Sequence, residues 1–458
     1  MNALIISAIF GVIMMFSGIV LKQKTAIRQL AIAGTLLLLV LNILELQGIH
    51  LFHVDTRGMI AFDNFALIFD TIAAACTFLF LLLSAKDMEK IGQHYAEYFA
   101  LLFFVLCGIA LTVSFKSLLI LFLGIEIISI PLYILTGSDK RNLKSNEASL
   151  KYFLLGAFST GLMLMGIALI YGARGTFASF DINVFTQNKP SLLLMAGMLL
   201  MLFAMSFKAS AAPFHFWTPD VYDGAPTPIT SFMATIVKVG VFVGFIRLFD
   251  EAFGFLLPQW KLYVGIIVVA TLLIGNITAV FQQSVKRMLA YSSVAHAGFM
   301  MMAIYAMNSD AKEGLLLYAA VYSLATIGIF AVLTKMKDYT FDGFNGFAKH
   351  QPLLAATTAI CLLSLSGIPL TGGFLAKFFM LKAVLASGHS LWLVIFAVLM
   401  AAVSVYYYFR LIQAMYFKEG DAPEIEVSAQ FKWTLIVITA LIILLGVYPD
   451  IISYWLYF

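Results

Sequence analysis

Two lysines lie inside apolar segments, where a charged side chain is costly. Lys208 and Lys238 are joined by a stretch dense in proline, tryptophan and aspartate, FKASAAPFHFWTPDVYDGAPTPITSFMATIVKVG at residues 207–240. An ionisable residue in an apolar span costs about 2.5–3.5 kcal/mol on insertion scales, so such residues are usually retained for function. Amines in this environment can bind and release protons. We infer that these two lysines take part in proton movement.

Glu126 is a carboxylate in the middle of an apolar run, SLLILFLGIEIISIPLYIL. We expect Lys208 to be its partner. Loss of water disfavours the charged form of either group, whereas a nearby opposite charge favours it. A lysine whose proton affinity depends on the distance to a carboxylate can load and release a proton, and Ser129 and Tyr133 can complete such a site. The alternative is a structural ion pair that joins two helices.

Three further groups extend this series. Lys238 is flanked by mostly apolar residues in ITSFMATIVKVGVFVGF, and Lys377 lies in GGFLAKFFML. His296, in KRMLAYSSVAHAGFMM, can accept a proton on one ring nitrogen and release it from the other. The alternatives are snorkelling of a lysine to the membrane interface and a hydrogen-bonded core histidine. Asp70, one turn into an apolar segment, is expected to be a half-solvated end residue.

The composition indicates a polytopic membrane protein. Of 458 residues, 62% are hydrophobic and 11% are charged, whereas soluble domains average about 45–50% and 25%. No basic stripe interleaved with aromatic residues suggests nucleic-acid binding. Cys76, Cys107 and Cys361 lie far apart without the spacing of metal ligands, and no glycine-rich phosphate-binding pattern follows a strand. We therefore expect neither a metal nor a cofactor on this chain.

The apolar segments predict an all-α integral membrane fold with about 14 transmembrane helices, because a span needs about 20 mostly apolar residues. The whole chain, 1–458, is expected to form a single polytopic domain. Lysine and arginine are more frequent in the loops after odd-numbered segments, which places those loops in the cytoplasm and both termini outside. The segments are expected near residues 3–20, 29–46, 63–84, 97–113, 117–136, 151–172, 191–211, 228–248, 261–281, 288–306, 314–334, 352–385, 391–415 and 433–457.

Two of these segments, the seventh and the twelfth, are expected to contain breaks. Pro213 follows Lys208 closely, and a cluster of glycine and proline in SLSGIPLTGGFLAKFF precedes Lys377. Broken helices at membrane depth occur where the backbone is buried or lines a cavity, and paired breaks in two halves of a chain point to a transport site. Simple proline kinking is the alternative.

At these residues the chain resembles the antiporter-like membrane subunits of the proton-pumping NADH:quinone oxidoreductase, respiratory complex I. The resemblance covers nearly all of the chain and is most specific in HFWTPDVYDGAPTPITSF, residues 215–232. It is supported by LFLGIEIISIPLYIL, VKRMLAYSSVAHAGF and LSGIPLTGGFLAKF. Lysine at position 377 is typical of the N-type subunit, whereas the M-type usually has glutamate there.

The resemblance implies a three-helix N-terminal unit (1–96), two inverted five-helix repeats (97–250 and 261–417) and a C-terminal helix (431–458). It implies broken helices at spans 7 and 12. It assigns proton transfer to five residues of this chain: Glu126, Lys208, Lys238, His296 and Lys377.

The resemblance also implies where this chain works and with what. It implies the bacterial inner (plasma) membrane and a hetero-oligomeric complex with M-type and small K-, J- and A-type subunits. FMN, iron–sulfur clusters and quinone are expected in partner subunits. A redox-driven change elsewhere would separate Glu126 from Lys208 and send a proton through Lys238 and His296 toward Lys377. The alternatives are a cation/proton antiporter subunit of the Mrp type and a non-pumping scaffold.

Overall fold

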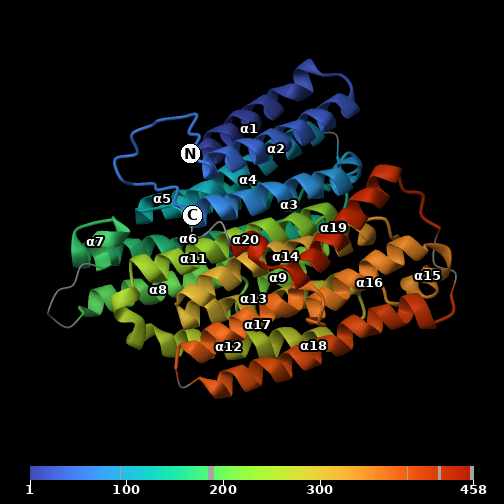
Figure 1. Cartoon of the computed structure of the whole chain (residues 1–458). Coiled ribbons are helices and arrows are strands. Elements are labelled where there is room, and N and C mark those ends of the chain that lie inside the picture. Colours follow the sequence, from blue (N-terminus) through green and yellow to red (C-terminus); the bar gives the residue numbers. More distant parts are fainter. Residues whose placement is uncertain (93, 184–189, 389, 421–423, 454–458) are drawn as a thin grey trace.

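The computed structural model describes residues 1–92, 94–183, 190–388, 390–420 and 424–453. Long helices packed side by side make up the molecule (Figure 1), and β structure in the described residues is limited to isolated bridges. Such helices satisfy their own backbone hydrogen bonds, as a chain in lipid must. The prediction of an all-helical membrane protein is confirmed.

Twelve helical runs among the described residues are long and apolar enough to cross a membrane. Two of them are composite: Thr227–Glu251 comprises α10 (Thr227–Phe232), the π-turn η1 (Met233–Val237) and α11 (Lys238–Glu251), and Gly254–Val280 comprises η2 (Gly254–Leu256) and α12 (Leu257–Val280). The others are α1 (Asn2–Val20), α2 (Lys24–Leu46), α3 (Asn64–Met88), α4 (Tyr95–Ser114), α5 (Leu118–Thr136), α6 (Leu143–Arg174), α13 (Val285–Ala306), α14 (Ser309–Leu333), α18 (Leu391–Phe417) and α19 (Ala429–Val447).

The seventh and twelfth predicted segments are divided, as the proline and glycine pattern indicated. The seventh forms α8 (Leu192–Lys208) and, after the residues around Pro213, α9 (Trp217–Gly224). The twelfth forms α16 (Pro352–Ser366) and α17 (Gly372–Ala386). The total of 14 spans stays a prediction, because these pieces are individually too short to count as spans.

Short elements complete the described chain. The predicted last segment, 433–457, is wrong in extent: α19 ends at Val447 before Pro449 and is followed by the short α20, and residues 454–457 lie outside the described part. The remaining short helices are α7 (Ser179–Asn183), η3 (Asp342–Phe344), α15 (Phe347–His350) and α20 (Asp450–Ser453).

The helices that carry Lys238 and His296 are among the most deeply buried. The runs Thr227–Glu251 and Ser309–Leu333 are buried along their whole apolar length, and α13 is nearly so. By contrast, α1, α2, α6, α18 and α19 expose much of their apolar surface. In Figure 1, α1 and α2 lie along one edge of the molecule and α12 and α18 along the opposite edge. A helix that is apolar all round is buried by its neighbours, and this arrangement places Lys238 and His296 in the interior.

Candidate functional site

Glu126 and Lys208 lie near the same part of α5 but do not form the predicted ion pair. The Glu126 carboxylate accepts a hydrogen bond from Thr160 Oγ1 on α6 at 2.8 Å. Lys208, the last residue of α8, donates from Nζ to Ser129 Oγ at 2.8 Å and to Tyr133 OH at 3.4 Å. No Glu126–Lys208 contact within 4.0 Å occurs in the described structure. The amine is held instead by neutral hydroxyls on the following turns of α5.

Lys238 is fully enclosed, with 2% of its surface exposed. Its Nζ donates to the backbone carbonyl of Ser293 at 2.9 Å and to the hydroxyl of the same residue. The Tyr222 ring centroid lies 5.7 Å from Nζ, within the range of a cation–π contact. Lys238 directly follows the π-turn η1, and such turns are frequent at functional sites. No carboxylate forms an ion pair with this amine among the described residues.

Both ring nitrogens of His296 form hydrogen bonds. Nδ1 is 2.5 Å from Tyr318 OH on α14, and Nε2 is 3.0 Å from Tyr408 OH on α18. Tyr408 OH also bonds to the hydroxyl of Ser292, the residue next to Ser293. A neutral imidazole donates from one nitrogen and accepts at the other, and a hydroxyl can do either. The hydroxyls of Ser293, Ser292 and Tyr408 can each pass a proton, although no hydrogen bond joins the two serine hydroxyls in the described structure.

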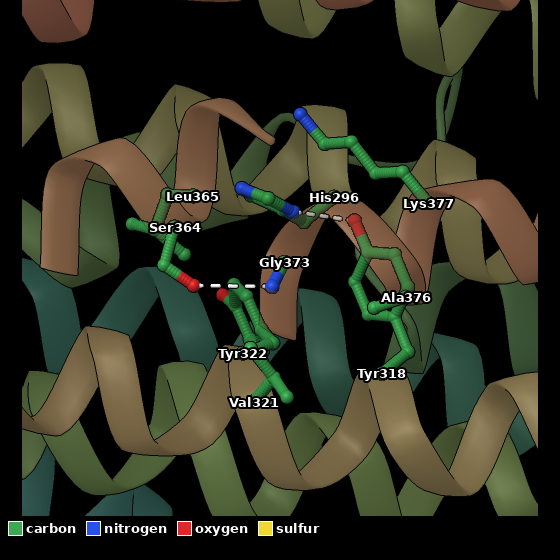
Figure 2. A pocket seen from close by; sticks show the side chains of 9 residues that line it. All are labelled: His296, Tyr318, Val321, Tyr322, Ser364, Leu365, Gly373, Ala376 and Lys377. Carbon is green, nitrogen blue, oxygen red and sulfur yellow. Dashed lines mark hydrogen bonds between the residues drawn. The ribbon is translucent and has the colours of Figure 1, made fainter. Parts of the chain in front are cut away.

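Lys377 lies with His296 on one small cavity between α13, α14, α16 and α17 (Figure 2). The cavity volume is about 10 Å³, which is near the lower limit for one water molecule. Lys377 Nζ donates to the Ser366 carbonyl at 2.9 Å and lies 5.0 Å from the Phe299 ring centroid. Because Ser366 ends α16, its carbonyl has no partner within the helix. The break thus supplies the acceptor that holds the amine.

Gly367 explains why α16 ends where it does. Its φ of 84° is left-handed, a conformation that glycine adopts readily at helix ends. A Cβ atom there would come within 3.0 Å of the Lys377 Cδ atom. The glycine therefore both ends α16 and leaves room for the Lys377 side chain.

The structure joins Lys238, His296 and Lys377 more closely than it joins Lys208 to Lys238. Between the two lysines, several buried polar atoms in the break after α8 and on the helices beside it have no hydrogen-bond partner in the described structure. Buried polar groups of this kind are usually satisfied by ordered water. They are the Nδ1 atom of His215 and the hydroxyls of Ser206, Ser210, Thr218 and Ser231. The hydroxyls of Tyr322 and Thr326, on α14, are also without a partner in the described structure.

Sequence reasoning missed the tyrosines that hold the histidine. Tyr318 and Tyr408 lie inside apolar segments of the sequence, where they read as core aromatic residues. The signal available was that a buried tyrosine hydroxyl normally needs a hydrogen-bond partner. Nothing in the sequence indicated that the partner would be His296.

Comparison with known proteins identifies the family. A family model described as "NADH:quinone oxidoreductase/Mrp antiporter, TM" matches residues 115–404. NADH-quinone oxidoreductase subunit N from Cytophaga hutchinsonii is 38% identical over 462 residues, which covers 99% of this chain and 98% of that protein. The chain belongs to the subunit N family of NADH-quinone oxidoreductases. The resemblance that the sequence motifs indicated is confirmed.

Solved structures show the same fold. A chain of respiratory complex I from Thermus thermophilus with bound aureothin is 30% identical, with a TM-score of 0.85 over 98% of both chains. A chain of the Mrp complex from Dietzia sp. DQ12-45-1b has a TM-score of 0.86 over 99% of this chain and 96% of that one. At 17% identity, the second likeness shows the fold alone.

Proposed function

We propose that this chain is a proton-translocating membrane-arm subunit of a respiratory NADH:quinone oxidoreductase. The observation that carries the proposal is the chain of protonatable groups in the buried interior of a subunit N family member. Lys238 bonds to Ser293, the neighbouring Ser292 bonds to Tyr408, and Tyr408 bonds to His296, which shares a cavity with Lys377. We call Glu126, Lys208, Lys238, His296 and Lys377 the proton axis.

Electrostatic switching at Glu126 and Lys208 is of the right size to drive transfer. Moving one proton against 100 mV costs about 2.3 kcal/mol. A tenfold to hundredfold change in the proton affinity of a lysine supplies about 1.4–2.7 kcal/mol. Approach of the carboxylate would favour the ammonium form of Lys208, and withdrawal would favour release. In the described arrangement the two groups form no ion pair, and we take it to be the arrangement from which Lys208 releases its proton.

The proton would move from Lys208 through the break after α8 to Lys238, and then through Tyr408 and His296 to Lys377. Water bound to the unpartnered hydroxyls in and beside the break would bridge the first interval. The cavity beside His296 has about the volume of one water molecule. Water there would bridge the last interval.

The proposal includes the setting of the chain. We propose 14 spans in two inverted repeats, with α8/α9 and α16/α17 as the broken helices and both termini on the outer side of a bacterial inner membrane. M-type and small K-, J- and A-type subunits would be its neighbours. FMN, iron–sulfur clusters and quinone would be bound by partner subunits, so that this chain carries protons and no electrons.

Purification of the tagged chain from its native membranes tests the proposal. We expect it to copurify with flavin- and iron–sulfur-containing subunits in a complex that reduces quinone with NADH. We also expect NADH oxidation to acidify one side of reconstituted vesicles. Copurification with antiporter subunits alone, together with sodium-dependent proton exchange and no NADH oxidation, would contradict it.

A further inference from the structure

A carboxyl group outside the proton axis is buried without a partner. Asp70 lies on α3, seven residues after the capping residue Asp63. The expectation that it would be half-solvated is wrong, because only 4% of its surface is exposed. Its Oδ2 atom is buried without a hydrogen-bond partner among the described residues. The sequence predicts a water-exposed helix end at Asp70, but neighbouring helices pack over this end of α3.

Asp70 faces a small internal cavity between α1, α2, α3 and α4. The other lining residues are apolar: Ala3, Leu38, Ala73, Ala74, Leu106 and Ile109. The cavity volume is about 10 Å³, again near the lower limit for one water molecule. The walls therefore offer the carboxyl no donor, and a single water molecule is the most that the cavity can supply.

The N-terminal amino group, at the start of α1, acts on Asp70 at a distance but is already paired with another carboxylate. The amino group of Met1 donates to Glu45 Oε1 at 2.7 Å, and the backbone nitrogen of Asn2 donates to Glu45 Oε2 at 2.8 Å. Glu45, on α2, adds a negative charge that acts on Asp70. This pair leaves Asp70 without a cation of its own on the first two helices.

Arg247, the cation on α11, is also paired with other carboxylates. Arg247 acts on Asp70 at a distance, but its guanidinium forms two hydrogen bonds with Asp63, at 2.6 and 2.7 Å, and one with Glu251 at 3.2 Å. Cys107 is the titratable neighbour on α4. An ionised carboxylate without water or a donor is very costly, whereas a neutral carboxyl group is far less so.

We propose that Asp70 is a further proton-binding site, whose carboxyl carries an exchangeable proton and binds one water molecule in the cavity. The site lies beside the proton axis and not on it. Ile109 lines the cavity and also packs against Gly240, two residues after Lys238, where a Cβ atom would lie 3.1 Å from it. An apolar side chain thus separates Asp70 from α11. The role of this proton in transport rests on the proposed function, but its presence does not.

Infrared difference spectroscopy of the assembled complex tests the proposal. We expect the wild type at neutral pH to show the carbonyl stretch of a protonated carboxylic acid, shifted to lower frequency after equilibration in D₂O. Asp70→Asn should lose this band, since asparagine resembles the neutral acid in shape. Asp70→Glu should move the band and serves as the second variant if the first does not assemble. Asp310→Asn, at a partly exposed aspartate paired with Lys382, is the matched control and should keep the band.

Two results would overturn the proposal. Identical spectra for wild type and both Asp70 variants would mean that the carboxyl is ionised. A band that is lost in Asp70→Asn but never shifts in D₂O would mean a permanently trapped proton. Both readouts are independent of pumping, so a failure of the proposed function would leave them unchanged.

Discussion

Each lysine of the proton axis is held by neutral oxygen atoms. Lys208 contacts two hydroxyls, Lys238 a carbonyl and a hydroxyl, and Lys377 a carbonyl. A buried ion pair would tie the proton to the amine, because its loss would leave an unpaired buried carboxylate. With neutral acceptors, a lysine can lose its proton without that penalty. This is the property that a relay group needs.

Tyr408 offers a residue-scale test of the link between Lys238 and His296. Tyr408→Phe removes the hydroxyl that bonds to His296 Nε2 and to Ser292. We expect NADH-driven proton pumping by the assembled complex to fall about tenfold. This lies below the usual effect of a proton-transfer group, because water can partly replace the hydroxyl. Proton uptake by reconstituted vesicles measures the change.

The neighbouring tyrosine provides the control. Tyr407 is equally buried on the same helix, but its hydroxyl bonds to Asn276 and not to the histidine. Tyr407→Phe should therefore keep pumping near the wild-type rate. Equal losses in the two variants would show that the defect is in packing and that Tyr408 is not a relay group.

At the scale of elements, the breaks could be predicted from the sequence, but their contacts could not. Proline and glycine set the ends of α8 and α16 through local backbone geometry. The site between α16 and α17 also depends on Gly373, where a Cβ atom would overlap with the Ser364 carbonyl oxygen. That close approach is a tertiary contact between two parts of the chain.

Gly373→Ala tests whether this close approach positions Lys377, four residues later. The added methyl group must push α17 away from α16 and displace the amine from the Ser366 carbonyl. We expect the pumping rate of the assembled complex to fall about tenfold, since relay groups act only at hydrogen-bond distance. Gly161→Ala is the control, because a Cβ atom on α6 would meet no atom within 4 Å. Wild-type pumping by Gly373→Ala would contradict this role.

Helix ends and polar pairings account for most of the differences between sequence prediction and structure. The run predicted at 288–306 begins at Val285 instead, because Ser284 caps the helix and the charged Lys286 and Arg287 lie in its first turn. A prediction based on hydropathy excludes such charged residues from the span, although they belong to the helix. The Glu126–Lys208 pair failed for a different reason: both residues have closer neutral partners. Sequence patterns identify groups that are costly to bury, but the three-dimensional packing decides what satisfies them.

At the scale of the whole molecule, burial divides the chain into a protected interior and an exposed apolar periphery. The helices with Lys238 and His296 are enclosed on all sides, whereas α1, α2, α6, α18 and α19 expose apolar surface. Protons moving inside such an interior are shielded from bulk water and from the outer surface of the molecule. The N-terminal helices α1 to α4 enclose the separate cavity of Asp70. In Figure 1, α1 and α2 lie on the side of the molecule away from α12 and α18.

Lys377 provides the most direct test of proton translocation by this subunit. Lys377 and Lys382 lie on the same helix, but Lys377 is buried beside His296 and Lys382 is half exposed and paired with Asp310. The measurement is the number of protons pumped per NADH oxidised by reconstituted complexes that carry Lys377→Met or Lys382→Met. We predict a clear fall for Lys377→Met and the wild-type value for Lys382→Met. A fully assembled Lys377→Met complex with unchanged stoichiometry and turnover would contradict the account.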